Sequence, residues 1–189
     1  MPKTKNQLNL EEFLALPDND TACELIEGKV VPKVSPKRFH SKVTGALFIL
    51  LSHWCQNRGE VGIEWAVTLK RRGKDWVPVP DLSYISYERL PKDRLRDEAC
   101  PVSPELAIEI ISPEQTFGQL AEKATDYLDA GVLRVWIVDS RARSITVFYP
   151  NAAPRTYTAA MPLTDLLFPE LQLTAERVFQ QAGIPEKTQ

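Results

Sequence analysis

Two carboxylates stand at positions that are unusual for residues with a purely structural role. Glu109 lies within the apolar run Leu106–Ile111. Burying a carboxylate in such a strand costs several kcal/mol unless it is paired or binds a metal. Asp81 follows Pro80 at the opening of an expected strand, from which its side chain can project over the end of a sheet. The spacing between the two acids leaves room for two strands and the loop that joins them.

A lysine on the apolar face of an expected helix is the third candidate. Lys123 belongs to a stripe at helical spacing whose other members are Leu120, Ala124, Tyr127 and Leu128. Two carboxylates on neighbouring strands can jointly hold Mg²⁺ or Mn²⁺, because these cations prefer oxygen ligands and Mg²⁺ keeps several waters. A lysine beside them can balance the acids, steer a phosphate and orient or deprotonate a water. The three residues therefore predict a divalent-metal site.

Each of the three residues also has a structural interpretation. Glu109 could form a buried salt bridge, Asp81 could simply begin a turn or a strand, and Lys123 could extend its amine to solvent. A metal site is favoured only if the three side chains meet in one place.

Hydrophobic periodicity predicts a mixed β-sheet with helices on both faces, in the α/β (α+β) class. The near-continuous apolar run at 104–112 fits a central strand, and Pro32 fits an edge strand. A helix of about two turns should follow Asn9 and end at Pro17 and Asp18. A long helix should open at Ser35-Pro36 and reach about Asn57.

The remaining expected elements follow from the same patterns. A hairpin should turn at 27–29, and 87–103 should be a surface loop. Strands are expected at 22–26, 30–34, 61–69, 77–86, 133–139 and 144–150, with a short strand near 155–159 and helices at 118–130 and 175–181.

Length, charge and cysteine content narrow the class of protein. The 189 residues fit one domain, and a formal charge of -2 argues against indiscriminate coating of nucleic acid, although a local basic patch is allowed. Three widely spaced cysteines indicate neither a disulfide framework nor a zinc cluster. The sequence lacks a P-loop, GxGxxG and GxSxG. It also lacks an apolar leader or span, so a cytoplasmic location is expected.

Four segments resemble a known nuclease family. CELIEGKVV, VPDLSYIS, PELAIEIISP and EKATDYLDAGVLRVWIVD are similar to the Uma-two-type restriction endonucleases, a branch of the PD-(D/E)XK nuclease superfamily. The resemblance is most specific over 104–139. It implies a single restriction-endonuclease-like domain over residues 1–189, with a core of about 22–149, an N-terminal β-hairpin and antiparallel C-terminal additions.

The resemblance implies roles for the candidate residues. Asp81 would be the first acid of the family motif and Glu109 the second. The usual lysine position, two residues after Glu109, holds Ile111, so the lysine would be moved to the following helix as Lys123. Glu24, within CELIEG, matches a family position and would have a supporting role.

The implied activity is metal-dependent hydrolysis of DNA phosphodiester bonds. Asp81, Glu109 and the backbone carbonyl of Ile110 would hold Mg²⁺ or Mn²⁺, which would lower the pKa of a bound water. Lys123 would orient that water and stabilise the developing charge. A homodimer is expected, since cutting both strands with one site per chain favours two-fold pairing.

Other parts of the sequence offer weaker signals. The basic residues Lys70, Arg71, Arg72 and Lys74 form a candidate DNA-contact loop, with a solvated hairpin turn as the alternative. His40, near the start of the long helix, could approach the site, but a capping or surface role is favoured.

Two competing functions stay open. One is a catalytically inactive nuclease-fold protein that acts as a DNA-binding or interaction module, and the other is a hydrolase of a small phosphate ester. Metal binding that depends on Asp81 would argue against the first, and a deep closed pocket would favour the second.

Overall fold

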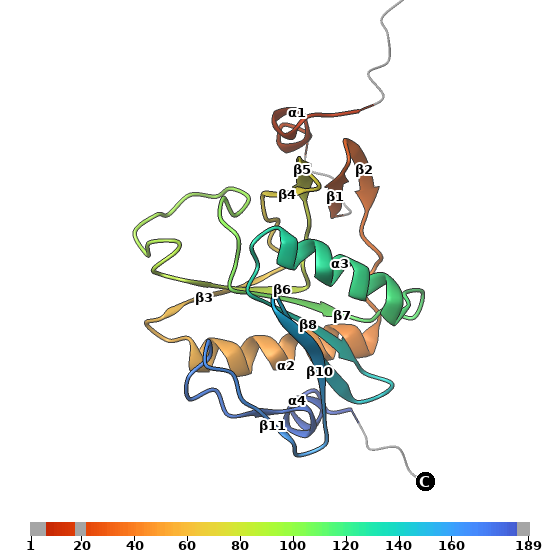
Figure 1. Ribbon diagram of the computed structural model, residues 1–189, viewed down its shortest axis with the longest axis vertical. Helices are drawn as coiled ribbons and strands as arrows, with labels where there is room; N and C mark the ends of the chain where they lie inside the picture. Colours follow the sequence, from red (N-terminus) through yellow and green to blue (C-terminus); the bar gives the residue numbers. More distant parts are fainter. Residues whose placement is uncertain (1–6, 18–21, 185–189) are drawn as a thin grey trace, which may run out of the picture.

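Two β-sheets form the framework of the computed structural model, which describes residues 7–17 and 22–184 (Figure 1). The larger sheet contains, in spatial order, β10 (Ala152–Thr158), β9 (Ser144–Tyr149), β8 (Arg134–Asp139), β7 (Leu106–Ile110), β6 (Leu82–Ser86) and β3 (Gly59–Ile63). The smaller sheet contains β2 (Lys29–Pro32), β1 (Cys23–Ile26), β5 (Lys74–Val77) and β4 (Leu69–Arg71). A short antiparallel pair consists of β11 (Pro162–Leu163) and β12 (Leu173–Thr174).

Helices cover both faces of the larger sheet (Figure 1). The four helices of the described residues are α1 (Leu10–Leu14), α2 (Arg38–Trp54), α3 (Phe117–Asp129) and α4 (Ala175–Gln181). Helix α3 and the smaller sheet lie on one side, and α2 and α4 lie on the other. The sequence prediction of a mixed sheet flanked by helices is therefore confirmed.

Strand β7 lies inside the larger sheet, and all five of its residues are buried. It pairs antiparallel with β6 and parallel with β8. Because side chains alternate along a strand, Leu106, Ile108 and Ile110 join the cluster beneath α2, whereas Ala107 joins the cluster beneath α3. Glu109 shares the parity of Ala107 and therefore faces α3.

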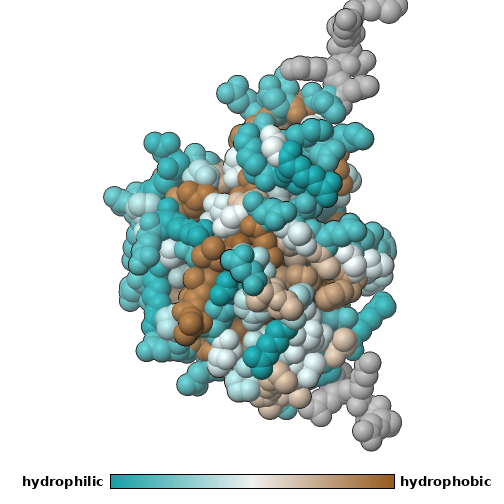
Figure 2. All heavy atoms as spheres, in the orientation of Figure 1, coloured by the Kyte–Doolittle hydropathy of each residue, from teal (hydrophilic) through white to brown (hydrophobic). Residues whose placement is uncertain are grey.

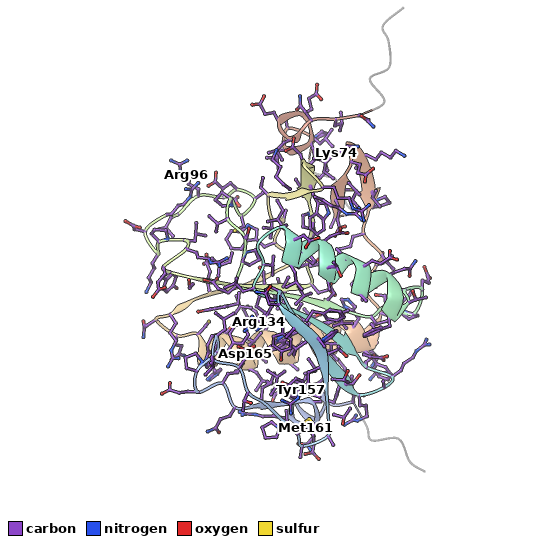
Figure 3. All side chains as sticks on the ribbon, in the orientation of Figure 1. Lys74, Arg96, Arg134, Tyr157, Met161 and Asp165 are labelled. Carbon is purple, nitrogen blue, oxygen red and sulfur yellow. The ribbon has the colours of Figure 1, made fainter. Side chains whose placement is uncertain are left out.

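The C-terminal segment packs against the central sheet from the α2 side. Val178 and Phe179 of α4 belong to the same buried cluster as Leu47 of α2. Arg134 of β8 also pairs with Asp165, its Nη2 lying 3.0 Å from the carboxylate Oδ1, and Figure 3 shows these two side chains together. The predicted antiparallel additions, β9 and β10, complete that edge of the sheet.

The predicted hairpin and first helix are present, but the helix is shorter than expected. Residues Glu27 and Gly28 form the hairpin turn with φ angles of 52° and 81°, and Pro32 lies on the edge strand β2. Asn9 caps α1 through a capping box with Glu12, yet the helix ends at Leu14. The predicted polar tail and Asp18 lie outside the described residues.

Two predicted strands are wrong. The segment 77–86 is not one strand, because β5 ends at Val77 in the smaller sheet and β6 begins at Leu82 in the larger one. The alternating pattern over 61–69 does not form a single strand, because β3 ends at Ile63 and β4 begins at Leu69. Glu64 adopts a left-handed conformation, with φ of 48°, which interrupts the extended chain. The chain leaves the larger sheet there and joins the smaller one, a change that a period of two cannot reveal.

Long helix α2 begins later than predicted, at Arg38 rather than Ser35-Pro36. Among the described residues, every helix is too short or too polar to span a bilayer. Figure 2 shows hydrophilic residues over much of the smaller sheet and α1, and hydrophobic residues gathered near the centre of the same face.

Two glycines give a matched test of the packing that positions β6. A Cβ atom on Gly59 of β3 would lie 2.2 Å from the Ile85 carbonyl oxygen, whereas one on Gly45 of α2 would meet nothing within 4 Å. We expect Gly59→Ala to lower the free energy of unfolding by about 1–3 kcal/mol through overpacking. Gly45→Ala should raise it by about 0.5–1 kcal/mol, because alanine favours a helix. Urea denaturation measures both, and equal effects of the two changes would contradict the described β3–β6 pairing.

Candidate active site

Side chains from both sheets and two helices meet in one pocket of about 400 Å³ at the end of β7. Glu24 comes from β1, Asp81 precedes β6, Glu109 lies on β7, and Lys123 comes from α3. Further lining residues include Lys33, His40, Ser112, Glu114, Gln115 and Gln119. The three acids and the lysine predicted from the sequence therefore share one cavity.

Asp81 reaches this position through the register of the central strands. Leu82 pairs with Ile108, and continuing that antiparallel register by one residue places Asp81 opposite Glu109. The Asp81 Oδ2 atom accepts a hydrogen bond of 2.7 Å from the Ile110 backbone N–H. His40 Nε2 lies 2.9 Å from the same oxygen. These two contacts fix the carboxylate beside the Ile110 peptide.

The Glu109 carboxylate is held by two side chains of α3. Lys123 Nζ lies 2.9 Å from Oε1, and the Tyr127 hydroxyl donates a 2.8 Å hydrogen bond to the same oxygen. Since Lys123 and Tyr127 are four residues apart, one face of α3 presents both groups. The capping box at Thr116 begins this helix and fixes where that face starts. Glu109 is thus a buried acid with its charge balanced.

Glu24 connects the smaller sheet to this centre. Its Oε1 atom accepts hydrogen bonds from Lys123 Nζ at 2.7 Å and from the Val79 backbone N–H at 3.0 Å. The amine of Lys123 therefore lies between two carboxylates.

A second lysine, Lys33, lies just beyond β2. Its Nζ is 2.6 Å from Asp81 Oδ1 and 3.3 Å from Glu64 Oε1. The left-handed turn at Glu64 places that carboxylate there. Each acid of the Asp81–Glu109 pair therefore has its own lysine.

The pKa of Asp81 is low despite its burial. Burial raises it, but the hydrogen bond from His40 and the charge of Lys33 outweigh that effect and bring the pKa to about 2. Burial alone would also lower the pKa of Lys33, whereas the Asp81 carboxylate raises it above the usual value. Both groups are therefore charged at neutral pH.

The second acid has the opposite shift. Burial, opposed by Lys123 and assisted by the charges of Asp81 and Glu24, raises the pKa of Glu109 above its usual value. For Lys123, burial favours a lower pKa, but the carboxylates of Glu109 and Glu24 outweigh it, so its pKa is raised. Two carboxylates whose pKa values move apart, with fixed cations beside them, are typical of sites that bind ions or activate water.

Comparison with known proteins places this chain in a family. A family model described as "Uma2: Putative restriction endonuclease" matches residues 10–176. This chain belongs to the Uma2 family. Among solved structures it is similar to a protein from Anabaena variabilis ATCC 29413 described as a "putative nuclease". The two share 25% sequence identity and a TM-score of 0.80, over 93% of this chain and 99% of the other. No curated protein matches the chain.

Membership of the Uma2 family and the nuclease-like neighbour confirm the restriction-endonuclease-like fold predicted from the sequence. The sequence-predicted residues Asp81, Glu109, Lys123 and Glu24 lie together in this fold. Their roles in the protein remain proposals.

The favoured capping or surface role of His40 is wrong, and the alternative in which it approaches the site is what the structure shows. His40 is buried and contacts Asp81, whereas Lys37 occupies the N-cap position of α2 without a side-chain hydrogen bond. The sequence held a signal for this, because His40 lies three and seven residues before Val43 and Leu47 on the buried stripe of the helix.

Two further residues of the site were missed. Tyr127 was counted among the apolar residues of its helix, although its hydroxyl needs a partner when buried. Lys33 carries no local signal, because its contact with Asp81 depends on how the chain passes from β2 to α2.

The basic run at 70–74 lies elsewhere, and its hairpin-turn interpretation describes the local structure. Arg72 and Gly73 form the turn between β4 and β5, and Lys74 stands at the far end of the smaller sheet (Figure 3). Lys70 pairs with Asp75, and Arg71 with Asp126 at 2.7 Å. DNA contact by Lys70, Arg71, Arg72 and Lys74 stays a prediction.

The donor atoms of the pocket fit a hard divalent cation. Within the described residues, no group of three or more His, Cys, Asp and Glu side chains is arranged to hold a metal. Two carboxylates, Asp81 and Glu109, nevertheless suit Mg²⁺ or Mn²⁺, which are commonly bound by one or two acids together with waters. The Ile110 carbonyl leaves β7 on the same edge as the N–H that Asp81 contacts. All three donors are oxygens.

Removing the amine of Lys123 should reveal the charge balance of this site. We expect Lys123→Met to lower the free energy of unfolding in EDTA at pH 8 by on the order of 3 kcal/mol, because two buried carboxylates lose their shared cation. The loss should be smaller at pH 5. The folded state already raises the pKa of Glu109, so this group takes up a proton more readily in the folded than in the unfolded chain.

Urea denaturation at both pH values measures this effect. Lys70→Met is the matched control, because Lys70 pairs with Asp75 at an exposed position and its loss should cost at most about 1 kcal/mol. Equal losses for Lys123→Met at pH 5 and pH 8 would argue against an ionised Glu109 beside this lysine.

Proposed function

We propose that this protein is a divalent-metal-dependent DNA endonuclease that hydrolyses phosphodiester bonds. The observation that carries the proposal is the meeting of Asp81 and Glu109 in one pocket, with Lys123 on the second acid. Membership of a family described as restriction endonucleases supports DNA as the substrate.

We propose that Asp81, Glu109 and the backbone carbonyl of Ile110 hold Mg²⁺ or Mn²⁺. When bound, such a cation lowers the pKa of a coordinated water and polarises a phosphate oxygen. The contacts of Ile110 N–H and His40 with Asp81 keep the first carboxylate ionised and oriented. Such supporting hydrogen bonds determine how well a ligand group is positioned.

Lys123 has two functions in this proposal. It compensates the buried charges of Glu109 and Glu24 in the resting protein. With a divalent cation neutralising the acids, its ammonium group can orient the attacking water and stabilise negative charge on the phosphate. In the resting protein the carboxylates of Glu109 and Glu24 raise the pKa of Lys123, so it is a cation at neutral pH.

Lys33 occupies the remaining side of Asp81. Its amine contacts Asp81 Oδ1, one of the oxygens available to a cation. We propose that Lys33 neutralises Asp81 in the absence of metal and turns toward a substrate phosphate when metal binds. Because the pocket is lined by four carboxylates and two ammonium groups, a dication would cancel its net negative charge and remove its repulsion of an anionic backbone.

Nicking of supercoiled plasmid in Mn²⁺ or Mg²⁺ tests the activity. Asp81→Asn and Glu109→Gln should each reduce the rate by about 100-fold or more, a loss typical for removing one group that stabilises the transition state. Glu105→Gln is the matched control, because Glu105 is equally buried but contacts Ser86 and Arg89 outside the pocket. It should leave the rate unchanged.

Nicking that persists in both Asp81→Asn and Glu109→Gln would exclude this pocket as the site of DNA cleavage. Wild-type protein without any metal-dependent nicking would favour the inactive DNA-binding or interaction module instead. The homodimer and the cytoplasmic location remain predictions.

A further inference from the structure

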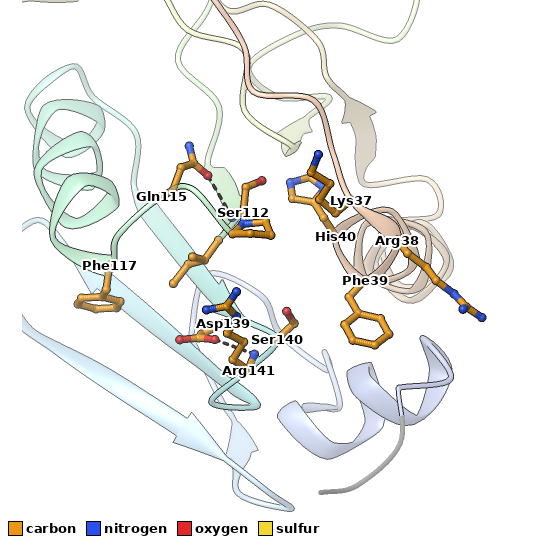
Figure 4. Close-up of a pocket in the computed structure, with 12 residues that line it drawn as sticks. Lys37, Arg38, Phe39, His40, Ser112, Gln115, Phe117, Asp139, Ser140 and Arg141 are labelled. Atoms are coloured by element: carbon orange, nitrogen blue, oxygen red, sulfur yellow. Dashed lines mark hydrogen bonds between the residues drawn. The ribbon is translucent and has the colours of Figure 1, made fainter.

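A second pocket, of about 470 Å³, adjoins the candidate active site (Figure 4). The two pockets share His40, Ser112 and Gln115, so a ligand can extend from one to the other. The second pocket lies between the first turns of α2 and α3 and the turn after β8. Its volume is within the range of small-molecule sites, about 300–1,000 Å³. We call it the Phe39 pocket.

The rim of the Phe39 pocket carries cations that the protein does not neutralise. Lys37, Arg38 and Arg141 line it, all three are exposed, and none forms an ion pair with a residue that the structure describes. Asp139 also lines the pocket, but its Oδ1 accepts hydrogen bonds from the backbone N–H groups of Arg141 and Ala142 at 2.8 and 2.9 Å. The rim is therefore positive and suits an anion.

Helix α2 adds to this preference. Its first turn contains no acidic residue, and Lys37 makes no side-chain capping bond. The first backbone N–H groups of the helix thus lack a side-chain acceptor and lie beside the pocket. Such groups bind phosphate oxygens well.

Two aromatic rings stand on opposite sides of the pocket. Phe39 comes from α2 and Phe117 from α3, and Figure 4 shows both side chains extending into the region above the turn that carries Arg141. They are 48% and 44% exposed, which is unusual for phenylalanine. Phe148 supports Phe117, with ring centroids 6.3 Å apart. Exposed aromatic rings next to cations are typical of sites where nucleobases stack.

We propose that the Phe39 pocket binds one unstacked nucleotide of a DNA strand whose neighbouring phosphate lies in the candidate active site. The base stacks on Phe39, Phe117 closes the opposite wall, and Lys37, Arg38 and Arg141 contact the phosphates of the nucleotide. The direction in which the strand runs rests on the proposed nuclease function. The two pockets share His40 and Ser112, so a nucleotide in the Phe39 pocket would place its neighbouring phosphate beside Asp81.

Binding of single-stranded DNA without metal tests the pocket separately from cleavage. Fluorescence anisotropy in EDTA at low salt compares a twelve-residue oligothymidylate with a chain of twelve abasic tetrahydrofuran nucleotides, which carries the same phosphates and no bases. Wild-type protein should bind oligothymidylate at least about fivefold more tightly, the lower end of what stacking contributes per base. Phe39→Ala should remove most of this difference, Phe117→Ala should reduce it less, and both should leave binding of the abasic oligonucleotide unchanged.

Arg141→Ala should weaken the binding of both oligonucleotides equally. The affinity should also depend less on salt concentration, because a phosphate contact is lost. Ile49→Ala and Arg96→Ala are matched controls, because Ile49 is an exposed apolar residue elsewhere on α2 and Arg96 is an exposed cation on the distant 87–103 loop (Figure 3). Neither should change the affinity. Thermal melting confirms that the variants are folded.

Three outcomes would overturn the pocket: no binding of oligothymidylate, equal affinity for the two oligonucleotides, or aromatic variants that bind like wild type. If the wild-type protein nicks plasmid but the aromatic variants bind oligothymidylate as tightly as wild type, the Phe39 pocket is rejected and the nuclease function is retained. If binding depends on the bases but no nicking occurs, the nuclease function is rejected and the Phe39 pocket is retained.

Discussion

A carboxylate buried on the central strand determines much of this structure. Glu109 is 3% exposed, and an ion at that depth is stable only beside a cation and hydrogen-bond donors. Helix α3 supplies both, through Lys123 and Tyr127, so the helix must pack with that face toward β7. Lys123 in turn contacts Glu24 and thereby links the smaller sheet to the larger one. One buried charge thus fixes the relation of a strand, a helix and a second sheet.

The same constraint bears on the chemistry proposed for the site. A buried ion pair adds little net stability compared with apolar packing, so a cluster of five charges is a costly way to join these elements. It does, however, hold Asp81 ionised against burial and positions it beside Glu109. The resulting pocket has fixed oxygen donors and fixed cations, which is the requirement for binding a divalent ion together with a phosphate.

Local patterns predicted the parts of this site that depend on periodicity. The apolar run around Glu109 identified a central strand, and the helical stripe identified Lys123 as inward-facing. The strand predicted from alternating apolar residues over 61–69 was wrong at Glu64, because a single left-handed residue redirects the chain without changing the hydrophobic pattern. Lys33 could not be predicted, since its contact with Asp81 depends on the path between separate elements. The position of His40 was only an alternative, although His40 continues the buried stripe of α2.

In the proposed function, Asp81 and Glu109 share one divalent cation in place of the Lys33 amine. Anomalous diffraction from crystals grown with Mn²⁺ measures this directly. We expect a manganese peak in contact with both carboxylates and with the Ile110 carbonyl, and a Lys33 amine that has left Asp81. A map at saturating Mn²⁺ that shows no peak between the two acids, with Lys33 still bound to Asp81, would show that the two carboxylates do not share a cation.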